Sequence, residues 1–171
     1  LSPEDTLTVY FNTLKKMNLE EMSSYLGVVD IMNTSDSVKN SIAEALVEQV
    51  HKNFNFKIKT SSVNGYNATV TTEITTFDSN AILSDYQHSL DNYLASPDSV
   101  INGSQKRYDK SLDLLLKSIE SNTASATSDV DFVLINDGTS WKLQDEGRTL
   151  GDAIFGTLTT SPLDDSSDSE S

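Results

Sequence analysis

The chain contains no cysteine, three prolines and two histidines. The missing cysteine excludes disulfides, thiolate zinc sites and cysteine nucleophiles. With two histidines, few side chains can serve as bases near neutral pH or as imidazole ligands. No apolar run approaches the roughly 18–20 residues of a membrane-spanning helix. The sequence therefore offers little of the chemistry that the commonest catalytic and metal motifs require.

Basic residues are also scarce, with 12 lysines and arginines against 26 acidic residues and a formal charge of −14. The last eight residues carry four of the acids and no base, and without those four the charge is still −10. An acidic surface repels phosphate groups, which disfavours binding to nucleic acid and to an anionic membrane surface.

The length of 171 residues and the 36% apolar fraction fit one domain with a sizeable core. Apolar residues extend to about Leu158. From Thr159 the chain is rich in serine and aspartate, with almost nothing to bury. We therefore expect a single domain over 1–158 and a disordered acidic tail over 159–171.

Helical patterns occupy the first third. Ser2-Pro3-Glu4-Asp5 predicts a helix start, because serine caps, proline suits the first turn and acids favour the positive end of the helix dipole. Apolar residues then recur at helical spacing from Leu7 to Leu14. Further helices are expected over about 19–26, capped by Asn18, and from Ser35 or Asp36 to Asn53.

Strand patterns follow. Phe54, Phe56 and Ile58 alternate with polar residues, which predicts a half-buried strand. Asn64-Gly65 predicts a hairpin turn. In the returning strand, we expect one face to be apolar and the opposite face to be rich in threonine; the expected apolar residues are Tyr66, Ala68, Val70 and Ile74.

Residues 79–123 return to helical spacing, with a loop through Asn102-Gly103. In the next strand Val133 and Ile135 interrupt the alternation, so we expect its end to be covered on both faces. Asp137-Gly138 predicts a turn into a short strand through Trp141, and a last amphipathic helix follows. The predicted fold is α+β, with helices on one face of a curved antiparallel sheet and a helical excursion (79–123) between two β-hairpins.

Three segments resemble cell-envelope lipoproteins of Gram-positive bacteria with the nuclear-transport-factor-2-like (cystatin-like) cone fold. They are the helix start at residues 2–5, the hairpin Asp137-Gly138 to Leu143, and Leu150–Gly156. The resemblance implies a lipid-modified cysteine upstream of Leu1 that tethers the domain outside the cytoplasmic membrane. Members of this group mostly lack a defined activity, and the wider fold includes isomerases, dehydratases and binding modules.

The sequence contains no recognisable catalytic or metal-binding motif. His51 and His88 lie on different predicted helices, and each is expected to have a structural or surface role. Adjacent acid pairs such as Glu20-Glu21 suit solvated faces, and no window supplies a calcium loop. We therefore predict no catalytic residue, no metal site and no cofactor.

Aromatic residues are the remaining clue. If the first helix lies over the concave sheet, five of them converge where a cone fold keeps its pocket: Tyr10, Phe11, Phe56, Phe132 and Trp141. The alternative is that they form a packed core, which we favour. Trp141 is expected at the core edge, where its indole N–H finds a partner.

Two functions remain open. The first is a non-catalytic extracellular module that binds a small molecule or a cell-envelope protein. The second is a small isomerase- or dehydratase-like enzyme, which needs an aspartate or histidine inside the cone. The chain is expected to be a monomer or a weak dimer, with the threonine-rich sheet face as a modest interface.

Overall fold

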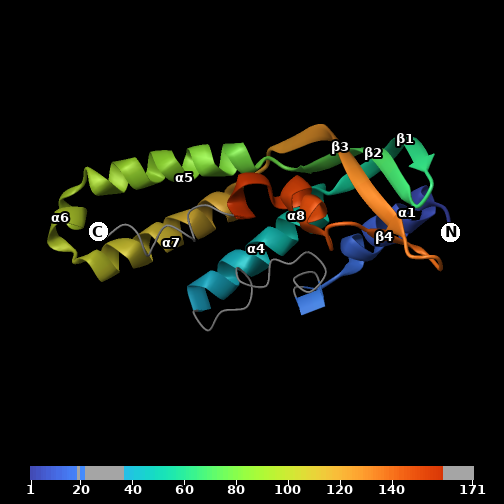
Figure 1. Cartoon of the computed structure of the whole chain (residues 1–171). Coiled ribbons are helices and arrows are strands. Elements are labelled where there is room, and N and C mark those ends of the chain that lie inside the picture. The colour runs from blue at the N-terminus through green and yellow to red at the C-terminus, as the bar shows by residue number, and fades with distance from the viewer. Residues whose placement is uncertain (19, 22–36, 160–171) are drawn as a thin grey trace.

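The computed structural model describes residues 1–18, 20–21 and 37–159 (Figure 1). Helix α1 (Pro3–Lys16) is capped by Ser2, whose hydroxyl accepts a hydrogen bond from the Asp5 N–H at 3.0 Å. The Asp5 carboxylate accepts in turn from the Ser2 N–H, which completes a capping box. The predicted helix start is therefore confirmed.

The second predicted helix lies largely outside the described residues. Where the chain is described, the Asn18 side chain accepts from the Glu21 N–H at 2.9 Å, as expected of a helix cap. Helix α4 (Ser37–Asn53) follows and matches the expected helix up to its end at Asn53. It buries one face, made of Ile42, Ala43, Leu46, Val47, Gln49 and Val50.

Four antiparallel strands form an open sheet in the order β1-β2-β3-β4, with bounds β1 (Asn55–Asn64), β2 (Asn67–Phe77), β3 (Ser125–Asn136) and β4 (Trp141–Leu143). Alternate residues of β2, from Ala68 to Thr76, are buried under the helices. The opposite face carries Thr69, Thr71 and Thr75 toward solvent, as expected. The predicted α+β fold, with helices on one face of an antiparallel sheet, is confirmed.

The first hairpin turn lies one residue later than predicted. Asn64 and Asn67 pair, so Gly65 and Tyr66 are the central turn residues, and only Gly65 has a positive φ (65°). That pattern matches a type II′ turn, which favours glycine at its first central position. Tyr66 therefore lies in the turn and is 70% exposed, so its expected place on the apolar face of the returning strand is wrong.

The excursion between the hairpins is a helical arm (Figure 1), formed by α5 (Ser79–Leu94), α6 (Pro97–Ile101) and α7 (Ser104–Ser121). Asp78 caps α5 by accepting from the Ala81 N–H at 3.1 Å. Pro97 begins α6 inside the segment that we expected to be a loop. A five-residue helix is too short for apolar periodicity to reveal.

The last described elements are α8 (Arg148–Phe155) and the short 3-10 helix η1 (Gly156–Thr159). Leu150, Ile154 and Phe155 are buried beneath the sheet, as the amphipathic pattern predicts. Thr159, the first residue of the predicted tail, belongs to η1, and the rest of that tail lies outside the described residues.

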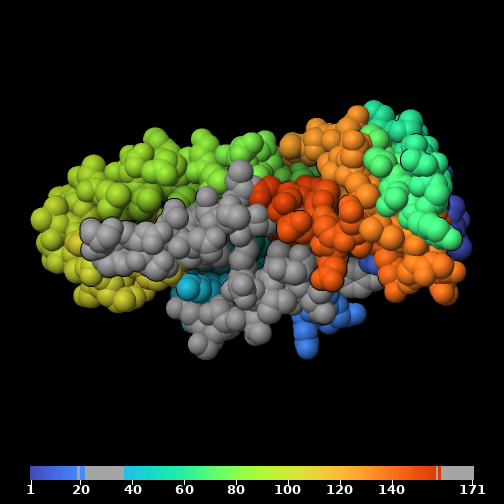
Figure 2. All heavy atoms as spheres, viewed as in Figure 1, coloured from blue at the N-terminus to red at the C-terminus, as the bar shows by residue number. Residues whose placement is uncertain are grey.

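The outer face of the sheet is open to solvent. Val133 and Ile135 point to this face and are 37% and 36% exposed, so the expected cover on both faces of β3 is wrong. Among the described helices, α1, α4 and α8 pack on the other face of the sheet, where Phe132 and Leu134 are fully buried. Figure 2 shows the sheet end and the helical arm at opposite ends of an elongated molecule.

Candidate functional site

Three of the five predicted aromatic residues meet where α1 crosses the concave face of the sheet. The Phe11 ring centroid lies 4.6 Å from that of Phe56 and 5.6 Å from that of Phe132. Phe54, just before β1, joins them at 5.9 Å from Phe11 and was not predicted. These distances are typical of rings in contact. Phe11 and Phe132 are fully buried, so at this point the two layers meet directly.

The other two candidates lie at the edge of this cluster. Trp141 is half-buried and packs against the core, in agreement with the edge position expected from its indole group. Tyr10 is also half-buried. The hydrogen bond and charge of Asp137 raise the pKa of Lys142, and Tyr10 adds a smaller contribution in the same direction. A small-molecule pocket among the five residues stays a prediction.

The chemistry that surrounds the cluster is apolar. Lys15 covers its outer side, with Nζ 5.2 Å from the Phe56 ring centroid and 3.2 Å from the Asn55 side-chain oxygen. Among the described residues, no histidine, carboxylate, lysine or arginine is buried in the core. An acid or base held in a low-dielectric interior is therefore missing from the described part of the chain.

Both histidines have structural or surface positions. His51 lies in the last turn of α4, and its Nε2 donates to the Met17 carbonyl at 2.8 Å. That bond satisfies a carbonyl at the C-terminus of α1 and ties α1 to α4. His88 is exposed on α5, 3.4 Å from Asn92. The structural role expected for His51 is thus specific: it joins two helix ends.

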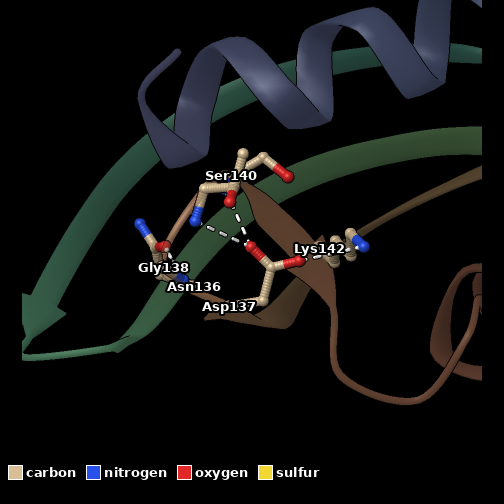
Figure 3. Close-up of polar contacts among 6 residues, drawn as sticks. Asn136, Asp137, Gly138, Ser140 and Lys142 are labelled. Atoms are coloured by element: carbon tan, nitrogen blue, oxygen red, sulfur yellow. Dashed lines mark hydrogen bonds and ion pairs between the residues drawn. The ribbon is translucent and has the colours of Figure 1, made fainter.

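The β3–β4 turn holds the most perturbed carboxylate (Figure 3). Oδ1 of Asp137 accepts from the backbone N–H groups of Thr139 at 2.9 Å and Ser140 at 3.0 Å, and Oδ2 pairs with Lys142 Nζ at 3.0 Å. The backbone bond from Ser140, followed by the Lys142 contact, holds the pKa of Asp137 far below its ordinary value. Gly138 adopts φ +96°, which the turn requires.

A second carboxylate organises the start of α8. Asp145 accepts from the backbone N–H of Gly147 at 3.1 Å and of Thr149 at 2.8 Å, and from the Thr149 hydroxyl. Partial burial works to raise the pKa of Asp145, but these hydrogen bonds outweigh it and lower that pKa. Both perturbed aspartates stabilise local backbone, which is a structural use of charge.

One buried polar cluster was not foreseen. Gln49 is buried and donates to the Ile119 carbonyl at 3.0 Å, while its own oxygen accepts from the Asn122 side chain at 2.9 Å. These bonds join α4 to the end of α7, where the arm returns to the sheet. The sequence hint was a glutamine within the apolar stripe of α4.

Within residues 1–18, 20–21 and 37–159, no three histidine, aspartate or glutamate side chains converge in a way that could hold a metal ion. Over the same residues, no helix is both long and apolar enough to cross a membrane.

No protein-family model matches this sequence, and neither does any curated protein. The fold is similar to that of a crystal structure from Bacillus subtilis, a "putative lipoprotein" (ycdA). The TM-score is 0.58 at 14% sequence identity. The similarity covers 86% of this chain and 54% of the other, so this chain spans about half the length of that protein. At this identity the similarity shows the fold alone.

Proposed function

We propose that the chain is the extracytoplasmic domain of a bacterial lipoprotein, and that it is a non-catalytic binding or interaction module. The proposal includes a nuclear-transport-factor-2-like cone as the type of fold, and a lipid anchor upstream of Leu1. Its support is the resemblance of three sequence segments to such lipoproteins, together with the similar fold of the Bacillus subtilis protein that carries the description "putative lipoprotein".

The observation that carries the non-catalytic part is the contact between Phe11, Phe56 and Phe132. Their rings lie 4.6 and 5.6 Å apart at the place where a cone fold keeps an active site. Catalysis of proton transfer needs an acid or base within hydrogen-bond reach of a substrate. The described side chains at this place are aromatic hydrocarbons with Tyr10 and Trp141 at the edge.

The isomerase- or dehydratase-like alternative requires a titratable group inside the cone. Asp137 and Asp145 are the two described aspartates whose pKa is lowered. Backbone N–H groups engage both oxygens of Asp145, and backbone N–H groups together with Lys142 engage those of Asp137. No observation favours this alternative, so we put forward the binding module by itself.

The proposed partner is a cell-envelope protein or a small molecule. The formal charge of −14 disfavours nucleic acid and an anionic membrane surface, so contact with the membrane is assigned to the lipid anchor. We propose that the domain is a monomer or a weak dimer, because the threonine-rich face of the sheet is polar and suits only a modest interface.

The tether is tested in the source organism with an antibody raised against residues 37–159. We expect the antigen in the membrane fraction, in the detergent phase after partitioning, and degraded by protease added to intact protoplasts. Recovery in the cytoplasmic fraction, protected from protease, would overturn the assignment.

The binding function is tested separately by native mass spectrometry of the full chain purified from that organism. A bound small molecule that is lost in a Phe56→Ala variant, but kept in a Val9→Ala control, would place a ligand at the aromatic cluster. A ligand-free mass together with turnover of an isomerase substrate would contradict the non-catalytic assignment.

A further inference from the structure

The end of the arm that lies farthest from the sheet presents two neighbouring aliphatic side chains to solvent. Val100 and Ile101, the last residues of α6, are 81% and 80% exposed. Leu94 at the end of α5 is exposed beside them. We call these three residues the arm tip. Single exposed aliphatics are common, but adjacent ones on a protruding element indicate an interaction site.

Hydrogen bonds hold the arm tip in one conformation. Arg107 on α7 donates to the Ser99 carbonyl at 3.1 Å and also to the Asn102 carbonyl. The Asn102 side chain donates to the Tyr93 hydroxyl at 2.8 Å. The buried Ser99 hydroxyl donates to the Leu94 carbonyl at 2.8 Å. A surface fixed before binding loses less conformational entropy when it binds.

The segment that contains the arm tip also differs from the rest of the chain in its net charge. Residues 91–110 contain three acids and three bases, so their formal charge is zero and the whole −14 lies elsewhere. Figure 1 places α6 and the N-terminus at opposite ends of the molecule. The exposed aliphatic side chains therefore lie in a segment with no net charge, at the end of the molecule opposite the N-terminus.

We propose that the arm tips of two copies of this chain dock against each other around a two-fold axis. A two-fold interface must be complementary to itself. The zero formal charge of residues 91–110 means that two copies of this segment carry no net repulsion when they meet. Within the described part of the chain, Asp98 and Lys106 flank the tip without an ion-pair partner, so each is available to the other copy.

The association is expected to be weak. Three aliphatic side chains and their surroundings fall below the roughly 1,200 Å² of a stable interface. We expect a dissociation constant on the order of 0.1–1 mM. This property belongs to the folded chain alone, so it stands or falls independently of the lipid anchor.

A crosslinking experiment uses the absence of cysteine from the chain. Val100→Cys and a control, Val9→Cys on α1, are oxidised under the same mild conditions; Val9 is 53% exposed and far from the arm tip. We expect disulfide-linked dimers of Val100→Cys to form at least tenfold faster. Equal rates for the two variants would overturn the proposal.

Sedimentation equilibrium up to millimolar concentration gives the second measurement. The unmodified chain is expected to gain average mass with concentration, whereas Ile101→Asp stays monomeric with an unchanged circular dichroism spectrum. Equal self-association of both chains would reject the tip as the interface. A monomeric chain that binds phosphatidylcholine vesicles, and loses that binding on Ile101→Asp, would identify a lipid surface in place of a second copy.

Discussion

Different kinds of interaction stabilise the sheet end and the arm tip. At the sheet end, rings from α1, β1 and β3 meet across more than a hundred residues of sequence, and their contacts are apolar. Around the arm tip, residues between 93 and 107 are joined by hydrogen bonds over short sequence distances. Apolar burial supplies most of the free energy of folding, whereas local hydrogen bonds mainly fix shape. The residues that stabilise the fold and the residues that present an apolar surface therefore lie in different parts of this molecule.

The buried Gln49 and Asn122 connect the two regions. Their side chains bond at the base of the arm, where α4, the end of α7 and the approach to β3 converge. The arm is thus fixed to the core by a satisfied polar joint, beside the buried apolar contacts of Ile82, Leu115 and Ile119.

Truncation at the centre of the aromatic cluster gives the largest expected effect. Phe11→Ala removes a fully buried ring that contacts Phe54, Phe56 and Phe132, so the free energy of unfolding should fall by about 3–5 kcal/mol. Val100→Ala at the arm tip should change it by less than about 0.5 kcal/mol. Urea denaturation measures both, and similar losses at the two sites would refute the separation.

The second prediction concerns the junction between α8 and η1. Gly156 has φ +56°, and a Cβ at this position would lie 2.3 Å from the Ser79 hydroxyl oxygen at the start of α5. We expect Gly156→Ala to destabilise the fold by about 2–3 kcal/mol through backbone strain and this clash. Adding Ser79→Ala should restore part of the loss. Full restoration would mean that the backbone conformation carries no strain.

A substitution in the middle of the sheet should stabilise the protein. Thr72 is fully buried on β2, and its hydroxyl has no hydrogen-bond partner among the described residues. Thr72→Val keeps the shape and removes an unsatisfied polar group, so we expect a gain of about 1 kcal/mol. The matched control Thr72→Ser keeps the hydroxyl, loses a methyl group and should destabilise. A loss in the valine variant would indicate a buried water as the missing partner.

At the arm tip, Arg107→Ala should change local order more than global stability. The variant loses the bonds to the Ser99 and Asn102 carbonyls. We expect amide exchange over residues 97–103 to accelerate at least tenfold while the free energy of unfolding falls by less than about 1 kcal/mol. Lys106→Ala, next in sequence and exposed, is the control. A large global loss would show that the tip belongs to the core.

Local patterns predicted the elements better than their surroundings. Helical spacing located α1, α5 and α7, because amphipathic periodicity reflects burial within one element. The Ser2 cap also located the start of α1. The run Phe132–Ile135 is apolar at every position, so it cannot reveal that only one face of β3 is covered. Whether a face is covered depends on distant helices, which a local pattern does not encode.

The candidate site shows the same limit. The spacing of Phe11, Phe56 and Phe132 indicated the correct faces of α1, β1 and β3, and the structure brings them together. Phe54 was assigned to the same strand face as Phe56 but was not included among the pocket candidates. The arm tip was missed because Val100 and Ile101 lie in a single turn, where periodicity has no length over which to act.

The smallest expected effect concerns the exposed Asp137 turn at the sheet end. The folded state lowers the pKa of Asp137, so the ionised carboxylate contributes stability above its unfolded pKa, and that contribution is lost as pH falls through the folded pKa. Asp137→Ala should therefore reduce stability slightly at neutral pH, and the difference from the parent chain should shrink as the pH is lowered below about 4. Because the ion pair between Asp137 and Lys142 is exposed, 1 M NaCl should also reduce the stability difference between the two chains. Thermal unfolding between pH 2 and 7 measures the difference, with Ser140→Ala as the control, since Ser140 donates through its backbone. A difference that grows toward low pH would contradict the lowered pKa and leave the turn held by its backbone alone.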